Sequence, residues 1–269
     1  MAYRDLDRPP LDASVLRAAL VGTGRFWTDI VVSATTGSTN ADVADAARAG
    51  APEGVIHTTD LQTAGRGRLD RVWESPVGSG VIVSVLLRPE GVPTARWVWL
   101  PLLVGLAVDA TARECGVVSG LKWPNDVEVD GRKLAGILLE RVNTPTGAAA
   151  IVGLGLNVSL RRDELPVQSA TSLALEGASE TDRTVVLRVF LRNLEALYRA
   201  WSATGGDPAA GIRESYARRC VTLGTRVRVS LPDGGSLEGQ ATGIDDLGRL
   251  LVDGTAISAG DITHVRPMT

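Results

Sequence analysis

The chain has 269 residues, of which 44% are hydrophobic and 22% charged, and its formal net charge is −3. This length can bury one sizeable core and carry a smaller second domain. The slightly acidic balance is typical of an ordinary globular protein and argues against general binding of nucleic acid.

Targeting and redox signals are read from the same sequence. The charged start, MAYRDLDRPPLD, has no apolar stretch typical of a secretory signal. The most apolar run, 98–108, is shorter than the roughly 20 residues that span a bilayer, so we expect no membrane partner. Cys115 and Cys220 lie far apart and form no CxxC pair. They predict no metal site and suit a reducing, cytoplasmic compartment.

Hydrophobic periodicity and turn residues predict the elements of the first half of the chain. In chain order we expect a helix at 11–21, a strand at 30–35, a helix that Gly50 ends, strands at 55–59 and 80–87, and a helix at 94–115. Ser38 or Thr39 is suited to cap the second helix, because either side chain can accept from its first N–H groups. Pro101 lies either in the first turn of the last helix or at a kink in it.

The second half begins with strands and continues with helices. We expect two strands around an Asp130-Gly131 turn within 121–140, a buried strand at 148–160, a helix at 184–203 opened by Thr184, and a helix at 208–219. Strands grouped ahead of helices favour an α+β fold over alternating βαβ units.

The texture of the sequence changes near residue 220. From 221 onward about five short strands are punctuated by the turn sequences PDGG, DDLG and DGT. Strands so closely spaced predict a small, SH3-like barrel. We therefore predict a domain boundary near residue 220.

One stretch, QTAGRGRLDRVW, concentrates positive charge between two predicted core strands. It holds Arg66, Arg68 and Arg71 beside Gly65 and Gly67. Long loops are uncommon in compact domains unless they bind or cover something. A solvated basic loop is the alternative, but the spacing of the cations favours an anion-binding role.

Lysine is rare in this chain, because among 28 basic residues only Lys122 and Lys133 are lysines. Both lie in one segment, LKWPNDVEVDGRKLAGILLE, together with Asn125, one of five asparagines. Codon bias explains the scarcity, but such a bias should leave lysine mainly where arginine cannot replace a compact ammonium. The segment is therefore a predicted site, in which Lys122 is either a ligand contact or a strand-end lysine paired with a carboxylate.

Several common chemistries lack their residues in this chain. Only two histidines occur, His57 and His264, both in strand patterns, so neither a Ser-His-Asp hydrolase nor a histidine-rich metal site is expected. No GxxxxGK[ST] phosphate loop occurs, and Gly153-Leu154-Gly155 lacks the third glycine of a dinucleotide turn. Such small residues in a strand instead admit a ligand or a neighbour. Fixed cations and scarce amides predict a site that stabilises negative charge, such as a polyphosphate or an acyl phosphate.

Five motifs together resemble the biotin protein ligases. They are Gly37-Ser38-Thr39-Asn40, then Gln62 with Gly65-Arg66-Gly67-Arg68, Arg71 and Trp73, then Lys122-Trp123-Pro124-Asn125-Asp126, then Arg132-Lys133-Leu134-Ala135-Gly136-Ile137, and Gly155-Leu156-Asn157-Val158. Their order and spacing match that family over roughly residues 35–160, and the small C-terminal barrel matches as well. The resemblance implies a lead-in at 1–34, a mixed-sheet catalytic domain of class II synthetase-like (biotin–lipoate ligase) fold at 35–219, and an SH3-like barrel at 220–269.

Members of this family join biotin to ATP as biotinyl-5′-AMP, release pyrophosphate, and pass the biotinyl group to one lysine of a carboxylase carrier domain. The resemblance therefore implies a biotin–[acetyl-CoA-carboxylase] ligase, with biotin, ATP and the carrier domain as partners. Mg²⁺ would accompany ATP, and no metal ligands of the chain's own are expected. The first step brings two anions together, which suits the clustered cations.

The resemblance also implies a role for each motif residue. Catalysis would rest on Lys133, Arg66, Arg68 and Asp126, the last orienting the acceptor lysine or taking its proton. Biotin would contact Ser38, Thr39, Asn40, Gln62, Gly65, Arg66, Gly67, Arg68, Lys133, Gly136 and Gly155. ATP or the adenylate would contact Arg68, Arg71, Trp73, Lys122, Asn125, Lys133 and Asn157. Trp73 would fold in as an apolar cover, on a loop that the ligand orders.

Other functions remain open at the level of sequence. A lipoate- or octanoate-type ligase shares the fold, a non-catalytic regulator would bind biotin without turnover, and an adaptor built around the barrel would leave the two-lysine segment unexplained. Only about 35 residues precede the GSTN motif, so we expect the short monofunctional form, with no DNA-binding domain and no DNA partner. The sequence leaves open whether the protein is a homodimer and what Leu69-Asp70 does among the arginines.

Overall fold

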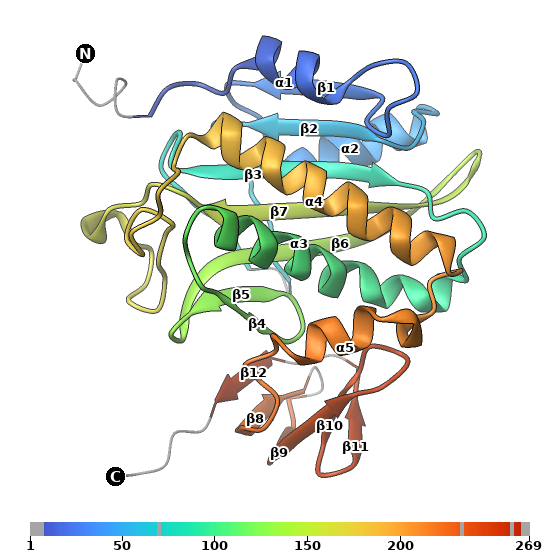
Figure 1. Ribbon diagram of the computed structural model, residues 1–269, viewed down its shortest axis with the longest axis vertical. Helices are drawn as coiled ribbons and strands as arrows, with labels where there is room; N and C mark the ends of the chain where they lie inside the picture. Colours follow the sequence, from blue (N-terminus) through green and yellow to red (C-terminus); the bar gives the residue numbers. More distant parts are fainter. Residues whose placement is uncertain (1–7, 69–70, 232–233, 259–260, 265–269) are drawn as a thin grey trace.

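The computed structural model (Figure 1) describes residues 8–68, 71–231, 234–258 and 261–264. Its centre is a seven-stranded sheet in the order β1-β2-β3-β7-β6-β5-β4. The strands are β1 (Asp29–Ser33), β2 (Val55–Thr59), β3 (Gly80–Leu87), β4 (Gly120–Lys122), β5 (Asp126–Val129), β6 (Arg132–Thr144) and β7 (Gly147–Asn157). β1 and β2 run parallel and every other neighbouring pair is antiparallel, so the sheet is mixed and the predicted α+β class is confirmed.

Helices cover the two faces of this sheet unequally (Figure 1). α3 (Leu100–Glu114) and α4 (Arg183–Ala203) lie together across one face and share the main apolar core with it. α2 (Thr39–Arg48) packs on the opposite face, in a small cluster that includes Val43 and Leu86. α2 has only 10 residues, and the cavity described below opens beside it on the same face.

The first helices confirm their predictions except for the details of their ends. α1 (Ala13–Leu20) begins after Asp12, whose carboxylate accepts from two backbone N–H groups of the first turn. Ser38 occupies the N-cap position of α2, but its side chain makes no capping hydrogen bond. Gln62 Oε1 accepts from Thr39 N instead, at 2.8 Å, so a residue of the following loop caps the helix.

The apolar helix expected at 94–115 consists of a 3₁₀ segment, η2 (Thr94–Trp99), and then α3. Pro101 lies in the first turn of α3, where a missing N–H group has no partner to lose. By length and composition Thr94–Glu114 could cross a membrane, yet 72% of its most apolar window is buried inside the protein. Its burial is that of a core helix.

The segment 121–140 holds one more strand than predicted. Its first strand is divided into β4 and β5, because Pro124 has no N–H to donate and the Trp123 N–H donates to Thr222 Oγ1 (3.1 Å). The turn that follows is as predicted. Asp130 and Gly131 have φ values of 49° and 76°, which a two-residue hairpin turn requires.

The later helices also differ in detail from the sequence pattern. Asp182, and not Thr184, caps α4, because its carboxylate accepts from Thr184 N at 2.7 Å. The helix expected at 208–219 is divided into η4 (Pro208–Ala210) and α5 (Ile212–Ala217). Gly211 separates them with φ 119°, a conformation that favours glycine.

The C-terminal residues form a second, five-stranded antiparallel sheet in the order β11-β10-β9-β8-β12. Its strands are β8 (Arg226–Ser230), β9 (Ser236–Ile244), β10 (Leu250–Val252), β11 (Thr255–Ile257) and β12 (Asp261–His264), at the bottom of Figure 1. The prediction of about five short strands is confirmed. Two buried indoles join this sheet to the rest, since Nε1 of Trp99 donates to Asp246 O and Nε1 of Trp123 to Gly248 O, both at 2.9 Å.

Candidate active site

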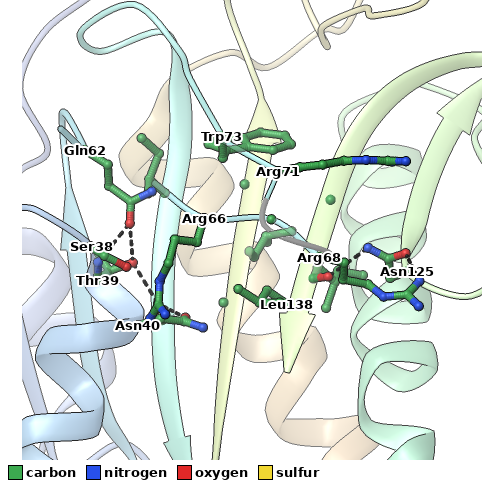
Figure 2. A pocket seen from close by; sticks show the side chains of 18 of the residues that line it. Ser38, Thr39, Asn40, Gln62, Arg66, Arg68, Arg71, Trp73, Asn125 and Leu138 are labelled. Atoms are coloured by element: carbon green, nitrogen blue, oxygen red, sulfur yellow. Dashed lines mark hydrogen bonds between the residues drawn. The ribbon is translucent and has the colours of Figure 1, made fainter. Parts of the chain in front are cut away.

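A cavity of about 130 Å³ opens on the α2 face of the central sheet. It lies between the start of α2, the arginine loop (residues 62–73) and strands β3, β5, β6 and β7. Fourteen residues predicted from the sequence line it: Ser38, Thr39, Asn40, Gln62, Arg66, Gly67, Arg68, Arg71, Trp73, Asn125, Asp126, Lys133, Gly136 and Gly155. Figure 2 shows Gln62, Ser38, Thr39 and Asn40 at one end, and Arg68 with Asn125 at the other. The fold therefore brings residues of all five motifs to one place.

Three predicted site residues do not line the cavity. Lys122 ends β4 beside the buried Glu128; burial raises the pKa of that carboxyl and the nearby ammonium opposes the shift. Asn157 is buried, and its Nδ2 donates to Thr171 O at 2.9 Å. Thr171 N in turn donates to Lys133 O, so Thr171 connects Asn157 with Lys133. Gly65 contacts other residues of the arginine loop, as the next paragraph describes.

The arginine loop folds back on itself as a small hairpin. Trp73 N donates to Gly65 O (2.9 Å), and Gly67 N donates to Arg71 O (2.6 Å). A Cβ at Gly65 would stand 2.3 Å from Trp73 O, so only glycine allows the two chain segments to approach this closely. Leu69-Asp70, whose role the sequence left open, lie outside the described residues.

The Trp73 ring occupies part of the cavity. A Cβ at Gly155 would stand 2.3 Å from this ring and one at Gly136 would stand 3.0 Å from it, so the indole rests on two stretches of bare main chain. Its Nε1 is buried and has no hydrogen-bond partner among the described residues. Ligand cavities usually measure about 300–1,000 Å³. The cavity is smaller than this, and the Trp73 indole is part of its wall.

Positive charge gathers at the other end of the cavity. Arg68 Nη1 donates to Asn125 Oδ1 at 2.9 Å, and burial lowers the pKa of this guanidinium while Asp126 opposes the shift. Lys133 Nζ lies 2.8 Å from Asp126 Oδ1, in an ion pair that is not aligned as a hydrogen bond, and 5.7 Å from the centre of the Trp73 ring. Arg68 is thus held by a neutral amide and Lys133 by a carboxylate.

Uncharged polar groups form a connected chain at the α2 end. Thr39 Oγ1 lies 3.1 Å from Gln62 Oε1 and 2.7 Å from Ser84 Oγ. Ser84 Oγ donates to Asn40 Oδ1 at 2.6 Å, and Asn40 Nδ2 donates to Glu140 Oε2 at 2.7 Å. Such a chain can recognise a polar but uncharged group.

Several lining residues were not among the site residues predicted from the sequence. They are Val72, Ile82, Ser84, Ile137, Leu138, Gly153 and Leu154. Ser84 is polar within the otherwise apolar run of β3, and this was the available signal for it. A Cβ at Gly153 would stand 2.3 Å from Asn40 Oδ1, as a Cβ at Gly155 would stand against Trp73. The expectation that these glycines admit neighbouring side chains is confirmed.

One constellation outside the cavity has the order of a hydrolytic triad. Ser33 Oγ lies 3.0 Å from His57 Nε2, and His57 Nδ1 lies 3.2 Å from Asp42 Oδ2. Asp42 Oδ2 also accepts from Thr36 Oγ1 at 2.6 Å. None of these residues lines the cavity, and together they tie β1, β2 and α2 to one another. We assign them a structural role.

The acidic residues of the site limit what metal it can hold. Across the described part of the chain, no three His, Cys, Asp or Glu side chains converge as a metal cage. Asp126 is the carboxylate that lines the cavity. Mg²⁺ in nucleotide sites commonly takes one or two carboxylates together with phosphate oxygens. The donor set therefore fits an ion that arrives with a nucleotide.

Comparison with known proteins gives consistent results over the whole chain. The profile of the "Biotin/lipoate A/B protein ligase family" matches residues 32–157, and that of the "Biotin protein ligase C terminal domain" matches residues 222–265. The biotin–[acetyl-CoA-carboxylase] ligase of Mycobacterium tuberculosis is 43% identical over 99% of this chain and all of that protein. The bifunctional ligase/repressor BirA of Bacillus subtilis is 35% identical over 88% of this chain and 72% of that protein.

Solved structures agree with these sequence matches. The biotin protein ligase from Aquifex aeolicus, in complex with biotin and ATP, has a TM-score of 0.74 at 27% identity, over 89% of this chain and all of that one. The biotin protein ligase from Leishmania major, in complex with biotinyl-5-AMP, has a TM-score of 0.60 at 21% identity, over 89% of this chain and 99% of that one, and supports the fold alone.

Proposed function

The chain belongs to the biotin/lipoate A/B protein ligase family and is a biotin protein ligase, and from this premise we propose how its cavity performs the reaction. The enzyme joins biotin and ATP as biotinyl-5′-AMP and transfers the biotinyl group to a protein lysine. The acceptor would be the carrier domain of acetyl-CoA carboxylase, which agrees with the name of the M. tuberculosis relative.

The observation that carries the proposal is the charge of the cavity. Arg66, Arg68, Arg71 and Lys133 line it, and among the described residues Asp126 is the carboxylate that lines it with them. In the first step a carboxylate oxygen of biotin attacks the α-phosphorus of ATP, and the bond from that phosphorus to the β-phosphate oxygen breaks to release pyrophosphate. Two anions must approach each other, and fixed cations offset their repulsion without any reorganisation of solvent.

The two ends of the cavity would divide the substrate between them. The end beside α2, with Ser38, Thr39 and Gln62, suits the cyclic urea of biotin, whereas Arg68 and Lys133 at the other end suit the carboxylate and the phosphates. Mg²⁺ would be held by the phosphates and Asp126, and when bound it screens phosphate charge. Trp73 would leave its two glycines and close over the adenylate.

The second step needs a neutral amine. The acceptor lysine attacks the acyl carbon of the adenylate, an amide forms, AMP leaves, and one proton must be taken from the nitrogen. Asp126 is the lining carboxylate that could orient this amine or take its proton. Without ligand it is paired with Lys133 at 2.8 Å, so Lys133 would first exchange that partner for the phosphate.

The function is tested by the products of each step. We expect pyrophosphate release from ATP and Mg²⁺ that depends on biotin, followed by biotinylation of an isolated carrier domain. Lipoate and octanoate serve as competing acids. If either acid supports turnover while biotin does not, the assignment to biotin is wrong.

A further inference from the structure

Glu140 lies just outside the cavity lining and contacts two groups that belong to it. It is in β6, with 29% of its side chain exposed. Its Oε2 accepts from Asn40 Nδ2 at 2.7 Å. Arg66 Nη2 lies 3.2 Å from its Oε1 and 3.3 Å from its Oε2. One carboxylate thus connects the first turn of α2 with the arginine loop.

The contact with Asn40 decides which way that amide points. An ionised carboxylate can only accept hydrogen bonds, so Asn40 must turn its NH₂ group toward Glu140. Its Oδ1 then faces Ser84, whose hydroxyl donates to it at 2.6 Å. Asn40 is only 4% exposed and Ser84 is fully buried, so neither has water as a ready alternative partner.

The orientation passes along the chain to Thr39. The single hydroxyl proton of Ser84 is donated to Asn40. At the 2.7 Å contact with Thr39 Oγ1, Ser84 Oγ can therefore only accept. Thr39 has one hydroxyl proton as well, and both of its neighbours, Ser84 Oγ and Gln62 Oε1, are acceptors. Whichever takes it, the hydroxyl oxygens at this end of the cavity keep only lone pairs for a ligand.

The Asn40 side chain packs closely against β7. A Cβ at Gly153 would stand 2.3 Å from Asn40 Oδ1 and 3.3 Å from its Nδ2, so the amide lies flat against the main chain of β7. An amide in this place can still turn over, which exchanges its donor and acceptor ends. The acceptor at Glu140 is what distinguishes the two orientations.

We infer that Glu140 is a positioning residue for the substrate, because its carboxylate fixes the Asn40 amide and so leaves the Ser84 and Thr39 oxygens as acceptors for N–H donors. A cyclic urea carries such donors, so the inference rests on the proposed function and adds to it the residue that sets the polarity of the biotin end. The Arg66 pair is the lesser contact, since that guanidinium is 52% exposed and exposed pairs contribute little.

The test compares two variants with different acceptor ability. Glu140→Ala removes the acceptor, and we expect the KM for biotin to rise on the order of tenfold to hundredfold, because a buried N–H group is left unpaired. Glu140→Gln loses the charge but keeps an oxygen that can accept from Asn40, so its KM for biotin should stay within about threefold of wild type. The KM for ATP should hardly change in either variant.

Matched variants separate positioning from a general loss of structure. Glu238→Ala removes another strand carboxylate that is paired with an arginine, Arg228, at similar exposure but in the second sheet; it should leave the KM for biotin unchanged. In an Asn40→Ala background, Glu140→Ala should add no further loss, since the amide through which it acts is gone. Glu140→Leu replaces Glu140→Ala if the alanine variant does not fold.

The outcomes are distinct. An unchanged KM for biotin in folded Glu140→Ala, an equal rise in both KM values, or a Glu140→Gln variant as impaired as Glu140→Ala would each overturn the inference. Calorimetric titration of biotin without ATP should give the same ranking of the variants. Failure of the proposed function would appear differently, as a wild-type protein that releases no pyrophosphate with biotin.

Discussion

Lys133 shows how the surroundings of one side chain define its task. Its ammonium lies between the carboxylate of Asp126 and the face of Trp73, and a Cβ at Gly136 would stand only 3.1 Å from its Cε. A compact charge fits such a slot better than a planar fork. Lys122 belongs to the same short segment, yet it ends β4 outside the cavity, beside Glu128. The two lysines of the chain thus differ completely in their contacts.

Lys133→Arg should therefore form biotinyl-5′-AMP nearly as slowly as Lys133→Ala. The guanidinium keeps the charge but displaces its donors by about 1 Å, which can cost on the order of a hundredfold in rate. The measurement is single-turnover adenylate formation. Lys122→Arg is the matched control and should react near the wild-type rate. Normal adenylate formation by Lys133→Arg would mean that charge alone suffices at this position.

Arg68 is a partly buried cation of the site with a defined partner, Asn125. Arg68→Ala should lower the rate of adenylate formation about tenfold to hundredfold, because it removes a charge-assisted bond worth roughly 1.5–3 kcal/mol. Arg228→Ala, in the second sheet, controls for the loss of an arginine in general. A folded Arg68→Ala protein with unchanged adenylation would show that this side chain does not meet the anion.

At the scale of elements, small residues on β7 hold the site together. Asn40 of α2 packs against Gly153, and Trp73 of the arginine loop packs against Gly155. One strand, β7, therefore supports side chains from a helix and from a loop. On the far edge, His57 of β2 binds Ser33 of β1 and Asp42 of α2. These two contacts hold α2, whose first turn carries polar groups of the cavity, against β1 and β2.

His57 should make the stability of the protein sensitive to mild acid. Burial lowers its pKa below 6.5, and Asp42 only partly opposes the shift. The unfolded chain then binds a proton more readily than the folded one, so stability is complete above about pH 6.5 and falls as the pH drops through the folded-state pKa. Carboxylates with lowered pKa values, such as Glu164 and Asp245, act only at lower pH.

Urea unfolding at pH 7.5, 6.5 and 5.5 measures this effect. The free energy of unfolding should decrease toward pH 5.5, and less steeply in His57→Asn than in wild type. His264, whose pKa is lowered by burial and by Lys122, gives a second contribution of the same sign and serves as a comparison through His264→Asn. Parallel curves for wild type and His57→Asn would assign the acid sensitivity to other groups.

In the molecule as a whole, the second sheet shares the main apolar core with the first. Trp99 and Trp123 are at most 2% exposed, and each indole N–H is satisfied by a carbonyl of the β9–β10 connection. Asp109, fully buried in α3, pairs with Arg219 just before the second sheet at 2.7 Å. The C-terminal residues are therefore part of the packing of the catalytic unit.

Truncation after residue 220 should destabilise what remains. Two indole hydrogen bonds, each worth about 1 kcal/mol, would be lost and both rings exposed, so we expect Tm to fall by at least about 4–8 °C. Circular dichroism gives Tm, and a red shift of tryptophan emission reports the exposure. Trp99→Phe, which loses one of the two bonds, should fall by about 2–4 °C. A truncated chain with the wild-type Tm and emission would make the second sheet independent of the first.

The local features of this protein could be predicted from its amino-acid sequence. Periodicity and turn residues located nearly every element, because side-chain alternation and backbone preference act over a few neighbouring residues. The clustered arginines and the two-lysine segment marked the site, because charge and chemical type are visible in one dimension. The family resemblance supplied the reaction, and the relatives with known activity support it.

Which of these residues contact one another depends on the three-dimensional fold. Asn40 and Glu140 are one hundred positions apart, and their contact depends on a helix and a strand packing on the same face of one sheet. Lys122 lies outside the site and Lys133 lies in it, because Pro124 and the Asp130-Gly131 turn divide their segment into three strands. Contacts between distant residues follow from the order and faces of the strands, and no short window of sequence contains that order.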